Sequence, residues 1–564
     1  MKENILVIDI GTQSLRASIV NKKGDILAFS KQKYEPAYYS PSKGFAEQNV
    51  DFYIDELVKA TSEIYQKDNE ILSTISSMIM DCFRDSSVIL DKDKKPIRKA
   101  ILWLDQRVRP FYKNENLKWY EKALFTLIGM KDTCRYNSER TPYYWLKENE
   151  EENIKKMKYY VPLGAYFNYK VTGNLVVSSA DCIGHYPINF KKGTYYSKHH
   201  PKSSIFGIPR ACLPDIVPVS SIIGEVNEEF SLLSKIPVGT KVIASASDKA
   251  CETLGNGCID IETASLSLGT ACTIDVVSKK YKESETFLPS YQAPYPNSYD
   301  LELQVYRGFW MITWYLNEFG LQDKIDAEKE NMPVLDYLSS KLNTVPIGCD
   351  GLILQPYWGP SLKRPNARGS IIGFSSVHTR YYLYRAMIEG IAFSLKEGLD
   401  EIIKRTHKKP ELIVVSGGGS SSKEICQIFC DVFDIPMMIS ATNESSTIGA
   451  AMAGFCALKV FSSPDEAKKN MVKEGFKLYP NKENSKLYQH LYKKVYKKIY
   501  PSLKKEYFSL KKFFLGIETN KLWNVLNKQS LINEVGCLFL IECDFYFRKP
   551  VTFLKNFVLK LKFN

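Results

Sequence analysis

Three features are missing from the sequence. No apolar stretch approaches the roughly 18 residues that a membrane-spanning helix needs, which argues against a membrane span. The thirteen cysteines include no Cys-x-x-Cys pair and are dispersed, so we expect reduced, buried thiols rather than a disulfide framework. No dense block of Lys or Arg accompanies the formal net charge of +13, so nucleic acid is not an expected partner.

What is present indicates an ordinary globular protein. Hydrophobic residues make up 44% and charged residues 25% of the chain. Its 564 residues exceed what one hydrophobic core can organise, so we expect two or more domains with a cleft between them as the natural site. The apolar run that ends at Asp9 is too short for the core of a signal peptide, and a soluble, cytoplasmic protein is therefore expected.

The order of apolar runs predicts two related halves. Residues 5–11, 15–21 and 24–34 read as a three-stranded meander, followed by a helix over 51–67, a strand over 75–83 and a hairpin over 88–97. A similar order returns later, with strand, Gly-Thr turn and strand over 265–277, a strand that ends in glycines over 412–419, and helices over 422–433 and 446–458. We predict domains over 1–255 and 256–510 and an extension over 511–564.

The extension has no motif. It is rich in Phe, Leu and Lys, and its apolar runs are broken by charged residues. A docked terminal segment, an amphipathic membrane-surface segment and sequence foreign to the ancestral fold all remain open, and no catalytic role is expected for it.

Two turns have the residues of a phosphate site. In the first, Asp9 closes a strand and a glycine then lets backbone N–H groups approach a phosphate, while the acid can hold Mg²⁺ through water. The second is SLGT, which lies between two strands in the other half. Alone, each turn is weak evidence, because a plain hairpin explains it as well or better; together they predict the two jaws of a nucleotide clamp. The candidate phosphate-binding residues are Gly11, Thr12, Gln13, Ser14, Arg16, Gly269 and Thr270.

A glycine run supplies a third element. Gly417, Gly418 and Gly419 lie between a predicted strand and a helix that begins at Ser422. Flat glycine backbone can accept a nucleobase and ribose where side chains would collide, so these four residues are further candidates for ATP binding. The competing interpretation is an ordinary glycine-rich turn between a strand and a helix.

With these elements in place, the chain resembles the FGGY carbohydrate kinases, the family of glycerol, xylulose, ribulose and gluconate kinases. The matching motifs run in order to about residue 510: DIGTQSLR, GFAEQN, AILWLDQR, YYWLKEN, SDKACETLGNG, SLGT, RGSIIGF, RAMIEGIAF, SGGGSSSKEICQIFCDVF and STIGAAMAG. The resemblance implies an α/β fold of the actin-like ATPase type, with the ribonuclease-H-like domain duplicated. It also implies that ATP, Mg²⁺ and a small sugar or polyol meet in the cleft between the domains.

The resemblance assigns roles to particular residues. Asp248 falls where the family has its catalytic base, and with Asp9 it is a candidate for the magnesium site. Removing the hydroxyl proton is the chemical task that phosphoryl transfer leaves to one carboxylate. The acceptor candidates are Arg84, Asp85, Trp103 and Asn137, and Glu47 lies in a loop that borders the same region.

Each assignment has a plain alternative. Asp248 could cap a helix, Arg84 and Asp85 could form a surface ion pair, and Trp103 could be core packing. The sequence also departs from the family pattern. Pro142 stands where a lysine usually precedes the tryptophan, and Asn137, Thr273 and Lys249 differ from the glycerol kinases, so glycerol is a less expected acceptor than a ketose or another polyol. SDKACETLG resembles a branch of the family known only as sugar kinases.

Three function classes follow. The leading hypothesis is an ATP-dependent carbohydrate kinase, and a non-catalytic sugar or nucleotide sensor on the same fold is the second. A chaperone-like ATPase would need a peptide-binding domain, and no β-rich module follows the nucleotide half. A homo-oligomer remains open.

Overall fold

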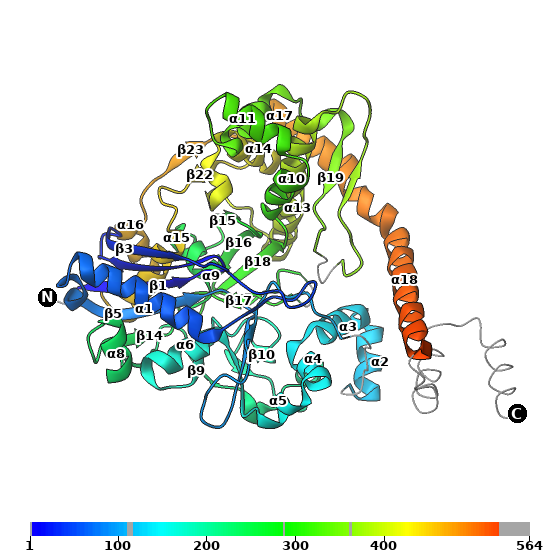
Figure 1. The fold of residues 1–564 in the computed structure, drawn as a ribbon. Coiled ribbons are helices and arrows are strands. Elements are labelled where there is room, and N and C mark those ends of the chain that lie inside the picture. The colour runs from blue at the N-terminus through cyan, green and yellow to red at the C-terminus, as the bar shows by residue number, and fades with distance from the viewer. Residues whose placement is uncertain (1–2, 110–116, 286–287, 360–363, 529–564) are drawn as a thin grey trace, which may run out of the picture. The chain divides into compact units, whose positions relative to one another are not determined.

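The computed structural model describes residues 3–109, 117–285, 288–359 and 364–528, with side chains up to residue 513 (Figure 1). The chain separates into two units, Met1–Lys497 and Lys498–Asn564. In the second unit the structure describes most of helix α18 (Lys497–Lys528), which continues through Pro501. No helix in the described ranges is long and apolar enough to cross a membrane. Because the description ends at residue 528, most of the extension predicted over 511–564 lies outside the described residues.

The first half is built on a six-stranded sheet in the order β13-β14-β5-β1-β2-β3. Strand β1 (Asn4–Ile10) is buried along almost its whole length because its residues are apolar on both faces. It pairs antiparallel with β2 (Ser14–Val20), which pairs in turn with β3 (Ile26–Lys33). The predicted meander is therefore confirmed. The remaining strands are β5 (Ile75–Cys82), β13 (Ile222–Glu225) and β14 (Lys241–Ile243).

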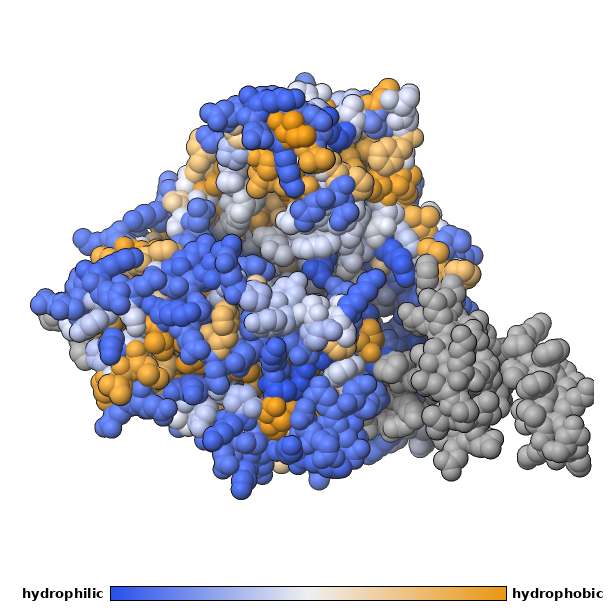
Figure 2. Space-filling model, viewed as in Figure 1, coloured by the Kyte–Doolittle hydropathy of each residue, from blue (hydrophilic) through white to orange (hydrophobic). Residues whose placement is uncertain are grey.

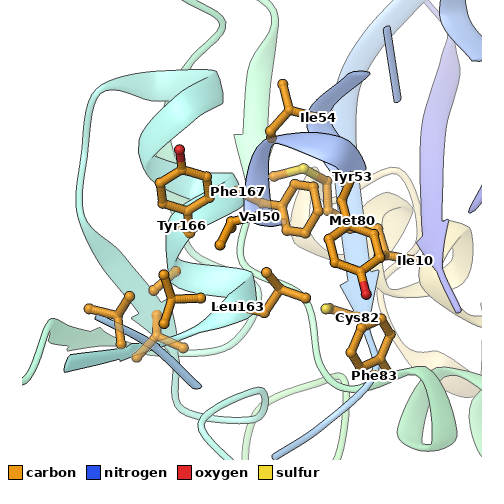
Figure 3. Packing of buried hydrophobic residues seen from close by; sticks show 14 of the residues in the cluster. Ile10, Val50, Tyr53, Ile54, Met80, Cys82, Phe83, Leu163, Tyr166 and Phe167 are labelled. Carbon is orange, nitrogen blue, oxygen red and sulfur yellow. The ribbon is translucent and has the colours of Figure 1, made fainter. Parts of the chain in front are cut away.

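Helix α1 (Val50–Lys67) confirms the helix predicted over 51–67 and covers part of this sheet. The Asn49 side chain caps it by accepting a hydrogen bond from the Asp51 N–H. Figure 3 shows side chains of α1 and α6 (Leu163–Thr172) packed beside the ends of β1 and β5. The Tyr53 and Phe83 rings meet edge to face with centroids 5.8 Å apart. This core fixes the strand ends from which the candidate residues project.

The second half is built on a seven-stranded sheet in the order β17-β18-β16-β15-β21-β22-β23. At its centre β15 (Thr263–Leu268) pairs antiparallel with β16 (Cys272–Ser278) and parallel with β21 (Leu412–Ser416). In the first sheet β1 pairs in the same way with β2 and β5. The duplicated pattern predicted from the sequence is confirmed. The outer strands are β17 (Tyr291–Gln292), β18 (Tyr299–Val305), β22 (Met437–Ile439) and β23 (Phe476–Leu478).

Two helices connect the halves by a close crossing. Helix α15 (Ser445–Ala457) packs against α9 (Asp248–Gly255) and also against β1 and β5 of the first sheet. A β-carbon on Gly449 would lie 1.8 Å from the Cys251 carbonyl oxygen, and one on Gly255 equally close to that of Ser445. The predicted domain boundary between residues 255 and 256 falls between the strands of the first sheet and those of the second. Helix α15, however, belongs to the second half of the sequence and packs on the first sheet. The domain limits therefore stay a prediction.

Several further helices surround the two sheets or line the site. They are α2 (Trp119–Leu127), α3 (Lys131–Arg140), α4 (Pro142–Asn149), α7 (Pro201–Phe206), α10 (Trp310–Glu318), α13 (Arg380–Thr406) and α14 (Lys423–Phe433). On the face shown in Figure 2, hydrophobic residues form separate patches among hydrophilic ones.

Candidate functional site

A cavity of about 710 Å³ contains most of the predicted site residues. Its walls come from both sheets and from the helical region around α3 and α7. It is lined by Gly11, Thr12, Gln13, Ser14, Arg16, Arg84, Asp85, Trp103, Asn137, Asp248 and Thr270. Asp9, Gly269, Gly417, Gly418, Gly419 and Ser422 are not among its lining residues. The structure thus brings the first turn, the acceptor candidates and Asp248 together; their roles remain predictions.

Asp248 is the first residue of α9. The preceding Ser247 is the helix cap, since its side chain accepts a hydrogen bond from the Ala250 N–H. The capping role considered for Asp248 therefore belongs to its neighbour. Asp248 faces the cavity, and burial raises its pKa to about 6, although the positive charges of Lys249 and Arg84 oppose this rise. A carboxylate with a pKa near neutrality is suited to accept a proton.

Asp9 lies beside a second carboxylate that the sequence reading missed. Asp9 and Asp81 are paired in the register of the parallel strands β1 and β5. Arg16 Nη1 donates to Asp9 Oδ2 at 2.8 Å, whereas Asp81 Oδ1 is buried without a hydrogen-bond partner among the described residues. Burial and the charges of Asp9 and Asp248 raise the pKa of Asp81. One signal was available in the sequence: Asp81, like Asp9, is the only acidic residue of its strand and lies one residue before the strand ends.

Arg84 and Asp85 both line the cavity but have separate partners. Arg84 Nη2 donates to Glu302 Oε1 on β18 at 2.8 Å, and its guanidinium lies 5.2 Å from the centre of the Tyr291 ring. Asp85 Oδ1 lies 2.9 Å from Nδ1 of His185 and accepts a hydrogen bond from the His185 backbone N–H at 2.9 Å. The alternative considered above, a surface ion pair between Arg84 and Asp85, is therefore wrong. Arg84 instead forms an ion pair with Glu302, which joins the first half of the chain to the second.

The sequence pattern did not predict Glu302 or His185 as the partners of Arg84 and Asp85. Glu302 follows Arg84 by 218 residues and His185 follows Asp85 by 100, and neither stands in a recognised motif. Burial of the guanidinium would lower the pKa of Arg84, but Glu302 and other nearby groups raise it above its usual value. Arg84 is thus a cation held at the cavity wall.

Trp103 links the acceptor region to the first turn. Its indole Nε1–H donates to Thr12 Oγ1 at 2.9 Å, and its backbone N–H donates to Ser86 Oγ at 3.1 Å. Trp103 is partly buried against the core and also lines the cavity, so part of its apolar surface is accessible to a ligand. Pro142, the departure from the family pattern, begins α4 and also lines the cavity.

Two other acceptor-side predictions have different settings. Asn137 lies on α3 and lines the cavity. Glu47, in contrast, is not a lining residue and accepts from Arg107 Nη2 at 2.6 Å, with Arg98 as a further ion-pair partner. The Glu47 carboxylate therefore contacts the cavity only indirectly, through Arg107, which is a lining residue.

The glycine-rich elements of the second half lie against one another. A β-carbon on Gly417 would meet backbone atoms of Leu268 at 2.9–3.1 Å, so the glycine run abuts the end of β15, just before Gly269. Gly419 packs on the Phe309 ring, while nothing lies within 4 Å of a β-carbon placed on Gly418. Ser422 caps α14 by accepting from the Ile425 N–H, as its predicted place at a helix start requires. An open glycine surface is what a nucleobase needs, and this role stays a prediction.

Comparison with known proteins places the chain in a family. Residues 4–255 match the N-terminal domain of the FGGY family of carbohydrate kinases, and residues 264–458 match its C-terminal domain. Among curated proteins, an uncharacterized sugar kinase of Escherichia coli, YgcE, is 25% identical over 86% of this chain and 91% of its own length. A xylulose kinase of Lactococcus lactis is also 25% identical, over 86% of this chain and 94% of its own. A gluconokinase of Bacillus licheniformis is 24% identical over 92% of this chain and 100% of its own.

Solved structures show the same fold. Xylulose kinase from Lactobacillus acidophilus superposes with a TM-score of 0.75 at 22% identity and covers 90% of this chain and 100% of that one. Glycerol kinase from Plasmodium falciparum with ADP superposes with a TM-score of 0.68 at 18% identity and covers 88% of this chain and 98% of that one. These neighbours confirm the predicted α/β fold of the actin-like ATPase type.

Proposed function

Because the chain belongs to the FGGY family of carbohydrate kinases, we propose that it transfers the γ-phosphoryl group of ATP to a hydroxyl of a sugar or polyol. Membership confirms the resemblance inferred from the motifs and the enzyme class, a phosphotransferase with an alcohol acceptor. The observation that carries the proposal is Asp248, a carboxylate of pKa about 6 at the wall of a cavity shared by both halves.

In the proposed reaction Asp248 is the general base. Its carboxylate accepts the proton as the acceptor O–H bond breaks, the new O–P bond forms, and the bond to the β-phosphate oxygen breaks to release ADP. The transition state is loose, so the rest of the site positions the groups and offsets charge. The Gly11–Ser14 and Gly269–Thr270 turns offer backbone N–H groups to the phosphates, and Gly418 offers open backbone to the nucleoside.

The residues present fit a magnesium ion. Mg²⁺ prefers oxygen ligands and commonly uses one or two carboxylates with several waters. Asp9 and Asp81 are paired across β1 and β5, and Asp81 Oδ1 has no hydrogen-bond partner in the described ranges. The described residues contain no group of three or more His, Cys, Asp or Glu side chains that could hold a metal. Asp9, Asp81 and Asp248 would therefore act through water molecules bound to the ion rather than as a set of direct ligands, and the bound ion would offset phosphate charge.

The acceptor region suits a ligand with several hydroxyl groups. Arg84 offers donors, the Asp85–His185 pair offers an acceptor and a ring nitrogen, and Trp103 offers an apolar face. A ketose such as xylulose, or a polyol, is the proposed acceptor, in keeping with relatives named xylulose kinase. A cytoplasmic location is proposed with it.

A coupled ADP-release screen over glycerol, erythritol, xylulose, ribulose, fuculose and gluconate tests this function. We expect one sugar or polyol to stimulate ADP formation strongly over the rate with ATP alone. Binding of both ligands without any stimulated turnover would instead support the non-catalytic sensor. Sugar-independent hydrolysis across the whole panel would also contradict the kinase.

A further inference from the structure

Lys249 occupies an unusual place for a lysine. It is the second residue of α9, directly after Asp248, and it lines the cavity. The first turn of a helix carries partial positive charge, so a cation there is disfavoured. Its i,i+3 partner is Glu252, and a lysine placed before its acid is the less favourable order along a helix. Helix stability therefore does not explain this residue.

The side chain is anchored so that its charge is fixed at the cavity. Lys249 Nζ donates to Glu252 Oε2 at 2.7 Å and to Ser267 Oγ at 2.8 Å. An ammonium group has three N–H donors, so one is left for a further partner. Burial would lower the pKa of Lys249, but the carboxylates of Glu252 and Asp248 raise it above its ordinary value. The hydrogen bonds to Glu252 and Ser267 thus hold the ammonium group at the cavity wall.

The anchoring network joins three predicted motifs. Ser416 Oγ, next to the glycine run, donates to Glu252 Oε1 at 2.6 Å, and Ser267 Oγ donates to Glu252 Oε2 at 3.1 Å. A β-carbon on Gly269 would lie 4.0 Å from Lys249 Nζ. The ammonium therefore lies beside the second candidate phosphate turn, and Lys249 and Asp248 both line the cavity.

We propose that Lys249 is a catalytic residue whose ammonium group contacts the transferring phosphoryl group between Asp248 and the Gly269–Thr270 turn. The inference rests on the proposed kinase function and adds a cation that this chain itself supplies. As the acceptor oxygen bonds to phosphorus and its proton passes to Asp248, charge spreads over the equatorial phosphoryl oxygens. A fixed N–H donor aimed at one of them stabilises that arrangement more than it stabilises bound ATP.

The test is kinetic and uses the full chain with ATP, Mg²⁺ and the sugar that the screen identifies. Lys249→Gln is expected to lower kcat about 10²- to 10³-fold, as loss of one donor to developing charge does, with KM values changed less than about threefold. Lys249→Arg retains the charge and is expected to recover at least about tenfold of the loss. As a matched control, Lys408→Gln removes an exposed lysine that pairs with Glu262 at 2.6 Å, and kcat is expected to stay unchanged.

A double variant separates chemistry from structure. If Lys249 only neutralised the Glu252 carboxylate, Lys249→Gln/Glu252→Gln would remove both charges and restore kcat; that result would overturn the inference. Continued loss in the double variant, with an unfolding temperature close to that of the parent, would support it. Binding of ADP with aluminium fluoride and the sugar, which mimics the transferring phosphoryl group, should weaken in Lys249→Gln while binding of ADP alone does not.

The two proposals can fail separately. If Lys249→Gln keeps kcat within threefold while Asp248→Asn is inactive, the role of Lys249 is wrong and the kinase stands. If Asp248→Asn is fully active, the proposed base itself is wrong.

Discussion

The pKa of Asp248 predicts how the reaction depends on pH. A general base must be ionised, so kcat/KM for the sugar should fall tenfold for each pH unit below about 6. At pH 7 about ten in eleven molecules are ionised, and at pH 5 about one in eleven, which gives roughly a tenfold difference in rate. An aspartate with an ordinary pKa of about 3.9 would be ionised at both values.

The assay is coupled ADP release at saturating ATP and low sugar, between pH 4.5 and 8, with the coupling enzymes in excess at each pH. The positive charge of Arg84 lowers the pKa of Asp248. Arg84→Gln should therefore raise this pKa and move the pH at which kcat/KM begins to fall on the acid side to a higher value. Lys408→Gln, a charge change outside the cavity, should leave that pH unchanged. A profile that is flat from pH 5 to 7 in the parent enzyme would refute the reasoning.

Three further predictions concern stability and the metal. Arg84→Ala leaves Glu302 buried without its cation and should lower the free energy of unfolding by about 3–5 kcal/mol, measured by urea denaturation; a loss below 1 kcal/mol would contradict a buried bridge. Gly449→Ala forces a methyl group into the close crossing of α15 and α9 and should lower the free energy of unfolding by about 1–3 kcal/mol or more. Gly418→Ala, with open space around its β-carbon, should lower the free energy of unfolding only slightly. Equal losses in the two variants would disprove the tight contact. Asp81→Asn should raise the Mg²⁺ concentration for half-maximal rate about tenfold, and an unchanged magnesium titration would remove Asp81 from the site.

The sequence predicted those parts of the fold that depend on local pattern. Strands β1, β2 and β3 follow from short apolar runs separated by turn residues, and the same rule found β15 and β16. The two candidate phosphate turns were located because glycine and hydroxyl residues follow directly on a strand. These signals need only neighbours in the chain.

Contacts between distant segments could not be predicted in this way. The partner of Arg84 is Glu302 on another sheet, and no spacing rule connects residues 218 apart. The position of Asp81 in an apolar strand is a local signal, but its pairing with Asp9 depends on the parallel register of β5 and β1, which the sequence does not show. The packing of α15 on the first sheet likewise depends on a crossing whose small residues give no local signal.

The most direct test of the central claim is the sugar-dependent rate of ADP formation in Asp248→Asn, measured beside ATP binding. The amide cannot accept the hydroxyl proton, so kcat should fall about 10²- to 10⁴-fold while the affinity for ATP is retained. A variant that still phosphorylates the sugar at a rate near that of the parent protein would contradict the account.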